Sequence, residues 1–310
     1  MPPGVRVLVT PNLARIVKEM SPRSWRTSPS WFDVDTTGTA LRALCTGAPE
    51  LRPDVVITSR RISKDELRPC DEGGLDGVLE AILGHVAIVV TRAKSGEPMP
   101  LSAETLRRAI LKRVPAPDDP TRFIPNPYSH WNQIDPSLEA RRIEVLGPAR
   151  DSSEFQVLIA ALLEPACAAG PASDRSEHEP ACHELRDDGF YTTARFDGTF
   201  IRQRLWSDPS VVAVLDYRFY AANSADLLSL LTGAAPTREN IVNGSYPLAR
   251  TLRLYVTRFR SSHAPPVSQL VHEYLRAQAN SRSDVVIAPD GATGSQWPPR
   301  PAPLNPVKLN

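Results

Sequence analysis

Apolar runs of strand length alternate with segments of helical spacing along the first part of the chain. Val5–Val9 and Asp54–Thr58 have the pattern of buried strands, and a longer apolar run covers His85–Thr91. Leu13–Met20 and Ser63–Arg68 carry apolar residues at helical spacing. Strands and helices in repeated order predict an α/β domain with a mostly parallel sheet.

Two segments between these elements carry different signals. Ser21–Trp31 is rich in Ser, Pro and Trp and predicts a loop. Thr37–Thr39 predicts a loop that runs into the start of a helix over Ala40–Cys45.

A second unit of the same kind follows. Ser102–Leu111 predicts a helix with Ser102 as its N-cap, and Phe155–Leu163 has helical spacing. Ile143–Leu146 and Val211–Leu215 predict strands. Two segments predict irregular connections, one rich in proline and the other polar and at the surface: Pro115–Pro127 and Gly170–Pro180.

The last part of the chain changes character. Leu252–Val256 predicts one more strand and Val267–Ala279 an amphipathic helix. From Ser281 onward the chain is rich in Pro, Gly and Ser, a composition that cannot bury enough apolar surface to fold alone. We expect an extended arm there, either disordered or docked on a protein partner through Trp297.

Length and charge narrow the class of protein. The 310 residues favour two compact domains. Lys plus Arg is 36 and Asp plus Glu is 35, so the net charge of +1 provides no basic field for general nucleic-acid binding. No stretch approaches the roughly 20 apolar residues that span a bilayer. The sequence as given also shows no signal-peptide pattern at its start, which by itself favours the cytoplasm.

The four cysteines favour an oxidising compartment instead. Cys45 and Cys70 flank one block and Cys167 and Cys182 another, without Cys-x-x-Cys spacing. Two local disulfides would each stabilise the fold by roughly 3 kcal/mol in the chain-entropy model. Free buried thiols are one alternative. The other is a metal site built from Cys167, His178, Cys182 and His183.

Several loops have the composition of an anion site. Thr10–Asn12, Thr37–Thr39 and Arg150–Glu154 each follow a predicted strand and lead into a helix, where backbone N–H groups favour anions. Ser59 and Arg60 end a predicted parallel strand, the place where open α/β sheets bind ligands. Each feature also has a plainer interpretation, because such hydroxyls commonly cap helices and arginines commonly face solvent.

Catalytic motifs are absent from the sequence. It contains no Gly-x-Ser-x-Gly elbow, no His-Glu-x-x-His and no Walker loop. His85 and His130 have no visible nucleophile as a partner, and we interpret both as structural. We therefore do not expect an enzyme, and no cofactor is expected either.

Dispersed blocks of the chain resemble one known family. Thr37–Gly47 followed by Asp54–Ile62 is similar to a block of phosphate ABC-transporter substrate-binding proteins, and Cys70 matches the later cysteine of that block. Further similar segments occur in the family's order: Trp131–Ile134, Glu144–Pro148, Leu163–Cys167, Arg186–Gly189, Ala235–Ile241 and Gly244–Arg250. The resemblance covers about residues 5–260.

This resemblance implies the type II periplasmic-binding fold, with two α/β lobes joined by crossing hinge strands and a ligand in the cleft. We expect lobe 1 in 1–90 plus 248–280, lobe 2 in 91–247 and a proline-rich tail in 281–310. It implies a periplasmic protein that binds phosphate, closes on it and delivers it to an ABC permease. The implied ligand contacts are Thr10, Thr37, Gly38, Ser59, Arg60, Ser152 and Ser153.

The chain departs from the family at three loops. Val7–Val9 precede Thr10 where the family has Gly-Ser-Ser, and Asp35 and Thr36 replace small residues. In the second lobe, Ser-Gly-Thr-Arg is replaced by Ser152–Phe155, which brings in the carboxylate of Glu154 and removes a cation that Arg150 could replace. The alternative function is therefore a degenerate member that has lost its ligand and serves as a structural or docking subunit.

Overall fold

The structure, a computed structural model, divides the chain into two compact units. It describes residues 5–10, 13–14, 16–17, 31–34, 37–46, 52–73, 77–119, 122–150, 152–168, 183–194, 198–257, 267, 286–287 and 305–306. Unit 1 comprises residues 1–86 and 250–310, and unit 2 comprises residues 87–249. The chain thus crosses between units at 86/87 and 249/250, where the sequence placed the crossings at 90/91 and 247/248.

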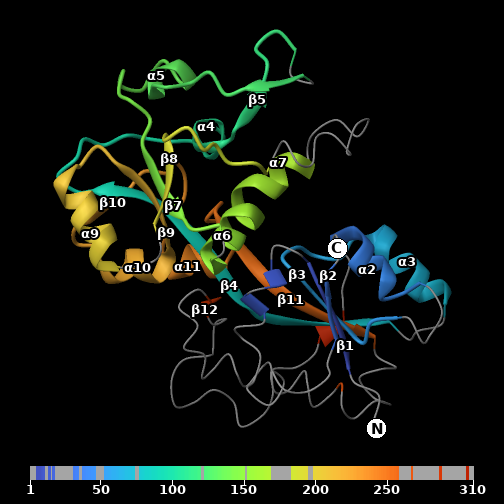
Figure 1. The fold of residues 1–310 in the computed structure, drawn as a ribbon. Coiled ribbons are helices and arrows are strands. Elements are labelled where there is room, and N and C mark those ends of the chain that lie inside the picture. The colour runs from blue at the N-terminus through green and yellow to red at the C-terminus, as the bar shows by residue number, and fades with distance from the viewer. Residues whose placement is uncertain are drawn as a thin grey trace. The chain divides into compact units, whose positions relative to one another are not determined.

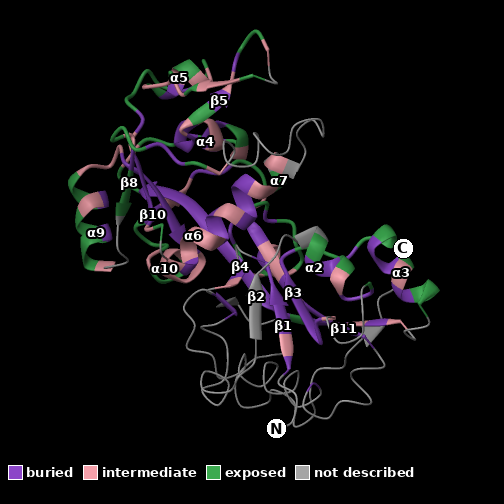
Figure 2. Ribbon diagram, turned by 45° about the vertical axis from the view of Figure 1, so that its right-hand side comes forward, coloured by how far each residue is buried: buried purple, intermediate pink, exposed green. Residues whose placement is uncertain are grey.

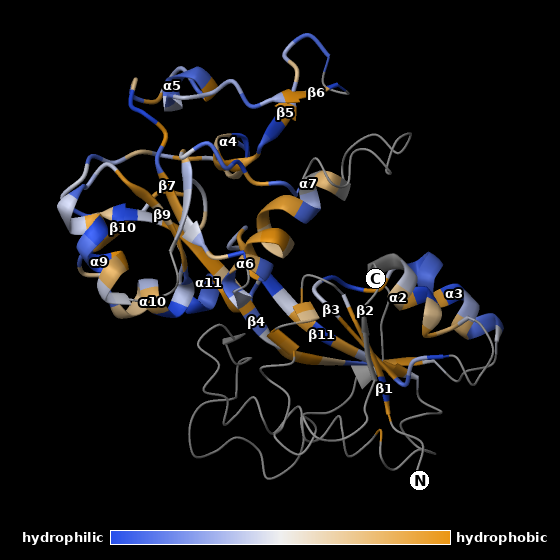
Figure 3. Cartoon of the chain, viewed as in Figure 1, coloured by the Kyte–Doolittle hydropathy of each residue, from blue (hydrophilic) through white to orange (hydrophobic). Residues whose placement is uncertain are grey.

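The sheet of unit 1 is built on three parallel strands. β1 (Arg6–Val9) lies between β2 (Trp31–Val34) and β3 (Val55–Thr58) and is parallel to both (Figure 1). β11 (Ala249–Thr257) is antiparallel to β3, and β4 (Val78–Ala93) follows it in the sheet. Most residues of β1, β3 and β4 are apolar and buried, as expected where both faces of a sheet are covered (Figures 2 and 3).

Two helices of unit 1 share one apolar core with these strands. α2 (Thr37–Ala43) and α3 (Lys64–Glu72) both contribute to it. The core also takes side chains from the four strands β1, β3, β4 and β11; its members include Leu8, Leu41, Leu44, Val56, Leu67, Val78 and Tyr255. This packing fixes both helices against the sheet.

Unit 2 repeats the same plan. β7 (Val145–Pro148) lies between β8 (Tyr191–Ala194) and β9 (Val212–Asp216) and is parallel to both. β4 is antiparallel to β9 and to the short β10 (Leu227–Ser229). Its described α-helices are α4 (Ala103–Ile110), α5 (Trp131–Ile134), α6 (Ser153–Leu158), α7 (Glu164–Ala168), α9 (Gly198–Ser207), α10 (Tyr217–Ala222) and α11 (Arg238–Val242), and the π-helix η3 (Ile159–Leu163) joins α6 to α7.

The family motif Glu144–Pro148 has a packing reason in this sheet. Gly147 faces the ring of Tyr191 on β8, and a Cβ atom at position 147 would collide with that ring. The Tyr191 hydroxyl donates to the carbonyl oxygen of Pro148 at 3.1 Å. Only glycine leaves the room that this tyrosine needs.

The predicted α/β class is confirmed, and most predicted elements form. The parallel strands β1–β3 and β7–β9 are accompanied by antiparallel pairings of β4, β10 and β11. Some local predictions were wrong. Trp31–Val34, taken as the end of a loop and the start of an undefined segment, is the parallel strand β2. Thr37–Thr39, predicted as a loop, is the first turn of α2. Pro115–Pro127 contains half of a hairpin, because β5 (Arg113–Pro115) pairs with β6 (Phe123–Pro125).

Other predictions lie mostly outside the described residues. Of Leu13–Met20, the described residues 13–14 and 16–17 are helical, and of Val267–Ala279 only Val267 is described. Gly170–Pro180 and Trp297 lie outside. Two short pieces of the predicted tail are strands: β12 (Val286–Ile287) and β13 (Asn305–Pro306) both pair with β4. No helix within the described ranges combines the length and apolar character needed to cross a membrane.

A buried polar network joins three parts of unit 1. Tyr255 on β11 is fully buried, and its hydroxyl donates to Glu80 Oε1 on β4 at 2.7 Å. The same hydroxyl accepts from the backbone N–H of Ile62 at 3.1 Å, and Arg253 Nη1 donates to Glu80 at 2.9 Å. Burial, followed by the bond to Glu80, raises the pKa of Tyr255, so the hydroxyl keeps its proton.

We expect Tyr255→Phe to lower the free energy of unfolding by about 2 kcal/mol, because it leaves the Ile62 N–H and the Glu80 carboxylate each short of a buried partner. Urea denaturation monitored by circular dichroism measures this change. Tyr217→Phe is the control, since no hydrogen bond of its hydroxyl is seen among the described residues. Equal stability of the two variants would contradict the role of the network.

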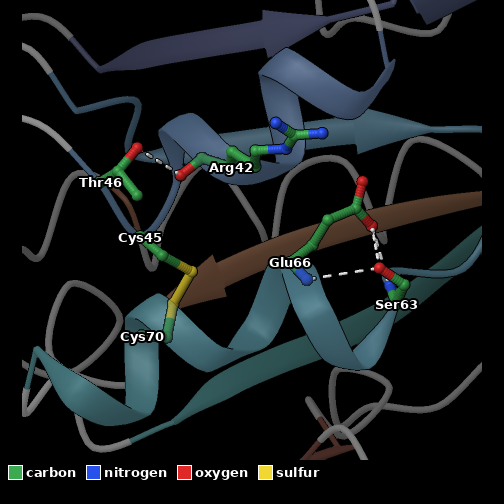
Figure 4. Close-up of a disulfide and its surroundings, with 6 residues drawn as sticks. All are labelled: Arg42, Cys45, Thr46, Ser63, Glu66 and Cys70. Atoms are coloured by element: carbon green, nitrogen blue, oxygen red, sulfur yellow. Dashed lines mark hydrogen bonds between the residues drawn. A yellow bond between two sulfur atoms is a disulfide. The ribbon is translucent and has the colours of Figure 1, made fainter.

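A disulfide joins the ends of the two helices of unit 1. Cys45, just after α2, is bonded to Cys70 in α3, with the two Cα atoms 4.5 Å apart (Figure 4). This predicted pair is confirmed. Cys167 is also disulfide-bonded, as favoured from the sequence, which excludes the alternative of a metal site that uses its thiolate. Cys182 and His178 lie outside the described residues.

The double variant Cys45→Ser/Cys70→Ser should lose about 3 kcal/mol of stability, because the bond closes a loop of 25 residues in the unfolded chain. Chemical denaturation of the variant and of the oxidised wild type measures the loss. The variant is preferable to a reductant, which would also attack the bond at Cys167. Peptide mapping that found free thiols at both positions in the native protein would overturn the prediction.

Candidate functional site

The predicted contacts of unit 1 gather at one edge of its sheet. Thr10 directly follows β1, Ser59 directly follows β3, and Thr37 and Gly38 open α2 shortly after β2 ends. Because β1, β2 and β3 are adjacent and parallel, their carboxyl ends lie at the same edge. Ligands of open α/β sheets bind at this edge.

The backbone at this edge is held in place by hydrogen bonds. Thr10 is fully buried; its N–H donates to the carbonyl oxygen of Ile57 at 3.3 Å, and its own carbonyl accepts from the N–H of Leu13 at 2.9 Å. Ser59 is also buried. Next to it, the hydroxyl of Thr58 donates to the carbonyl oxygen of Arg60 at 2.7 Å. These hydrogen bonds fix the backbone of the loop after β3.

Arg60 forms a two-pronged ion pair with Glu66. Its Nη1 and Nη2 atoms lie 2.9 and 2.5 Å from the two carboxylate oxygens of Glu66. The arginine side chain is 44% exposed, whereas that of Glu66 is 8% exposed. Arg60 is thus a surface arginine, as the plainer interpretation expects, and it is held by a buried carboxylate of the same chain.

Glu66 is held by the start of its own helix. Ser63 caps α3, and its N–H and hydroxyl both donate to Glu66 Oε2 at 2.9 Å, while its oxygen accepts from the N–H of Glu66 (Figure 4). This reciprocal arrangement is a capping box. Burial raises the pKa of Glu66, but the hydrogen bonds from Arg60 and Ser63 together outweigh burial and leave the pKa below its ordinary value.

The predicted contacts of unit 2 lie after β7. Ser152 is the N-cap of α6, and its oxygen accepts from the N–H of Phe155 at 3.1 Å. Its hydroxyl hydrogen remains able to donate to an anion, since a hydroxyl both donates and accepts. Ser153 is buried, and Arg150 donates to the carbonyl oxygen of Leu185 at 3.0 Å. Glu154 and Phe155 are half-buried in the first turn of α6.

Two carboxylates at these edges were missed by the sequence reasoning. Asp216 ends β9, next to β7, and caps α10 by accepting from the N–H of Phe219 at 2.9 Å. Glu66 occupies the fork of Arg60. Both had a signal: an aspartate follows the apolar run Val211–Leu215, and Ser63 and Glu66 have capping-box spacing.

The lowered pKa of Glu66 predicts how its contribution depends on pH. A carboxylate with a lower pKa in the folded state stabilises the protein above its unfolded pKa, and that stabilisation is lost as the pH falls through the folded value. Glu66→Gln should therefore be less stable than wild type near neutral pH, and the difference should shrink below about pH 4. Urea denaturation over a pH series measures it. A difference independent of pH would contradict the assignment.

Comparisons with known proteins agree with this architecture. Residues 24–276 match the family described as the PBP superfamily domain. The curated relative Protein SphX of Synechocystis is 23% identical over 252 residues, which is 79% of this chain; the match covers 65% of the length of SphX.

Two solved structures have a similar fold. One is a possible phosphate binding protein from Planctomyces limnophilus, with a TM-score of 0.66, 16% identity and coverage of 94% of this chain and 95% of that one. The other is PstS from Borrelia burgdorferi, with a TM-score of 0.53, 16% identity and coverage of 88% and 96%. Since the family match covers well over half of the chain, this protein belongs to the PBP superfamily, as the resemblance to periplasmic binding proteins predicted.

Proposed function

We propose that this protein binds a small oxyanion, with phosphate as the first candidate, and delivers it to an ABC transporter. The observation that carries the proposal is the gathering of Thr10, Thr37 and Ser59 at the carboxyl edge of three adjacent parallel strands. Membership of the PBP superfamily supports a binding function over an enzymatic one.

Phosphate is the first candidate for two reasons. A solved protein of similar fold, from Planctomyces limnophilus, is described as a possible phosphate binding protein. The chemistry of the edge also fits a tetrahedral anion, since hydroxyl and backbone N–H groups donate to its oxygens and a guanidinium can bind two of them at once. At the edge of unit 1, Thr10 and Ser59 supply hydroxyl groups and Arg60 supplies a guanidinium group. Within unit 2, Ser152, Ser153 and Arg150 supply the same groups after β7.

The same proposal includes the periplasm and a membrane permease as partner. The Cys45–Cys70 bond supports an oxidising compartment, because disulfides rarely persist in the cytosol. Delivery to a permease follows from the transport role of the family that the sequence resembles. The two strand pieces β12 and β13 show that part of the C-terminal segment pairs with β4, so we do not assign partner docking to that segment as a whole.

Isothermal titration calorimetry with phosphate, and with sulfate as the comparison anion, tests the proposal. We expect micromolar or tighter phosphate binding, weakened about tenfold by Ser59→Ala because a hydrogen bond to a charged group is lost. Ser224→Ala is the matched control, since this exposed hydroxyl donates to the carbonyl oxygen of Ala221 in a turn of unit 2.

Two results would count against the proposal. Absence of both heat and a thermal shift at millimolar phosphate would reject phosphate and favour a member of the fold that serves as a docking subunit. Equal loss of affinity in Ser59→Ala and Ser224→Ala would show that the edge after β3 does not hold the anion.

A further inference from the structure

The guanidinium of Arg60 forms an ion pair with the carboxylate of Glu66 in the loop after β3, where we propose that the anion binds. Arg60 directly follows Ser59 at the end of β3. Both terminal nitrogens of its guanidinium donate to the oxygens of Glu66, and Nη1 also donates to the carbonyl oxygen of Arg61 at 2.9 Å. The two terminal nitrogens, which can bind either a carboxylate or a phosphate, therefore already donate to Glu66.

The carboxylate is the less mobile partner of this pair. Glu66 is buried and receives hydrogen bonds from the N–H and the hydroxyl of Ser63, so the capping box fixes its position. Arg60 is nearly half exposed, and its long side chain can turn towards solvent or a ligand. An anion arriving at the edge would therefore have to draw Arg60 away from a fixed internal competitor.

The charges of the pair also cancel. With Glu66 ionised, the loop after β3 presents a neutral pair rather than a cation, and the carboxylate repels a second anion placed nearby. We propose that Glu66 is an affinity-setting residue, which competes with the bound phosphate-class anion for Arg60 and weakens its binding. This inference rests on the proposed function and assigns a role to a residue that makes no contact with the ligand.

Glu66→Gln tests the inference with little change of shape. Glutamine also satisfies the capping box through its amide oxygen, so the start of α3 should persist. It has lost the charge and one acceptor, and its amide N–H groups no longer hold the guanidinium fork. Calorimetric titration with inorganic phosphate should show a dissociation constant about fivefold lower than that of wild type, equivalent to about 1 kcal/mol.

Asp65→Asn is the matched control. Asp65 precedes Glu66 in the same helical turn, is 84% exposed, and pairs with Arg68 rather than Arg60. It removes the same formal charge without releasing Arg60, so phosphate affinity should stay near that of wild type. An equal gain of affinity in both variants would overturn the inference, because the effect would then come from net charge alone.

Arg60→Ala completes a double-mutant cycle with Glu66→Gln. The gain from Glu66→Gln should disappear when Arg60 is absent, because the competition acts through that side chain. A gain that persists without Arg60 would reject the mechanism. Weaker binding by Glu66→Gln in the presence of Arg60 would also reject it, and would show that Glu66 positions the arginine for the ligand.

The experiment separates this inference from the proposed function. If wild type binds phosphate but Glu66→Gln binds it no better, the competition is rejected and the oxyanion function stands. If neither protein binds phosphate, the proposed function fails and the inference fails with it. If Glu66→Gln binds phosphate and wild type does not, both the oxyanion function and the competition are supported. Glu66 would then compete strongly enough for Arg60 to prevent binding in the wild type.

Discussion

Strand β4 imposes the constraint on which both sheets depend. Its sixteen residues pair with strands of unit 1 near Leu79–Val86 and with strands of unit 2 over Ile88–Ala93. A shift of β4 by one residue against its partners in either unit would move its apolar side chains from the buried face to the opposite face of the sheet in that unit. Nearly all its residues are buried, so its apolar side chains contribute to both hydrophobic cores.

The place of β4 beside β11 also determines the buried polar contacts of unit 1. Glu80 on β4 is buried and would be costly alone, but Tyr255 and Arg253 on β11 donate to it. Tyr255 then reaches the N–H of Ile62 and ties the loop after β3 to the sheet. The residues that we propose to meet an anion, Ser59 and Arg60, begin that loop. The positions of Ser59 and Arg60 therefore depend on the buried contacts of Tyr255 as well as on the sequence of the loop itself.

The sequence predicted the buried strands well because continuous apolar runs such as Val86–Val90 signal strands buried on both faces. It missed β2, since Trp31–Val34 is short, contains Asp33 and acquires its strand conformation by pairing with β1. It also started α2 too late, because Thr and Gly at its first positions are typical of loops.

For the candidate site, the sequence could identify donor side chains but not their partners. Ser59 and Arg60 were found from their place after an apolar run. The pairing of Arg60 with Glu66 depends on how the loop after β3 turns into α3, which residue types alone do not specify. The capping box was visible in the spacing of Ser63 and Glu66, and it signals a helix start rather than a charge partner.

The position of the Cys45–Cys70 bond affects the order in which the parts of unit 1 can fold. The covalent ring contains β3 and the loop with Ser59 and Arg60, and it needs no residue beyond Cys70 to close. The other neighbour of β3 is β11, which begins 191 residues after β3 ends (249 − 58), and this long separation in sequence makes their pairing entropically slow. Formation of the Cys45–Cys70 bond can thus hold β3 close to α3 while unit 2 folds. The strand β11 then pairs with an edge of β3 that is already in place.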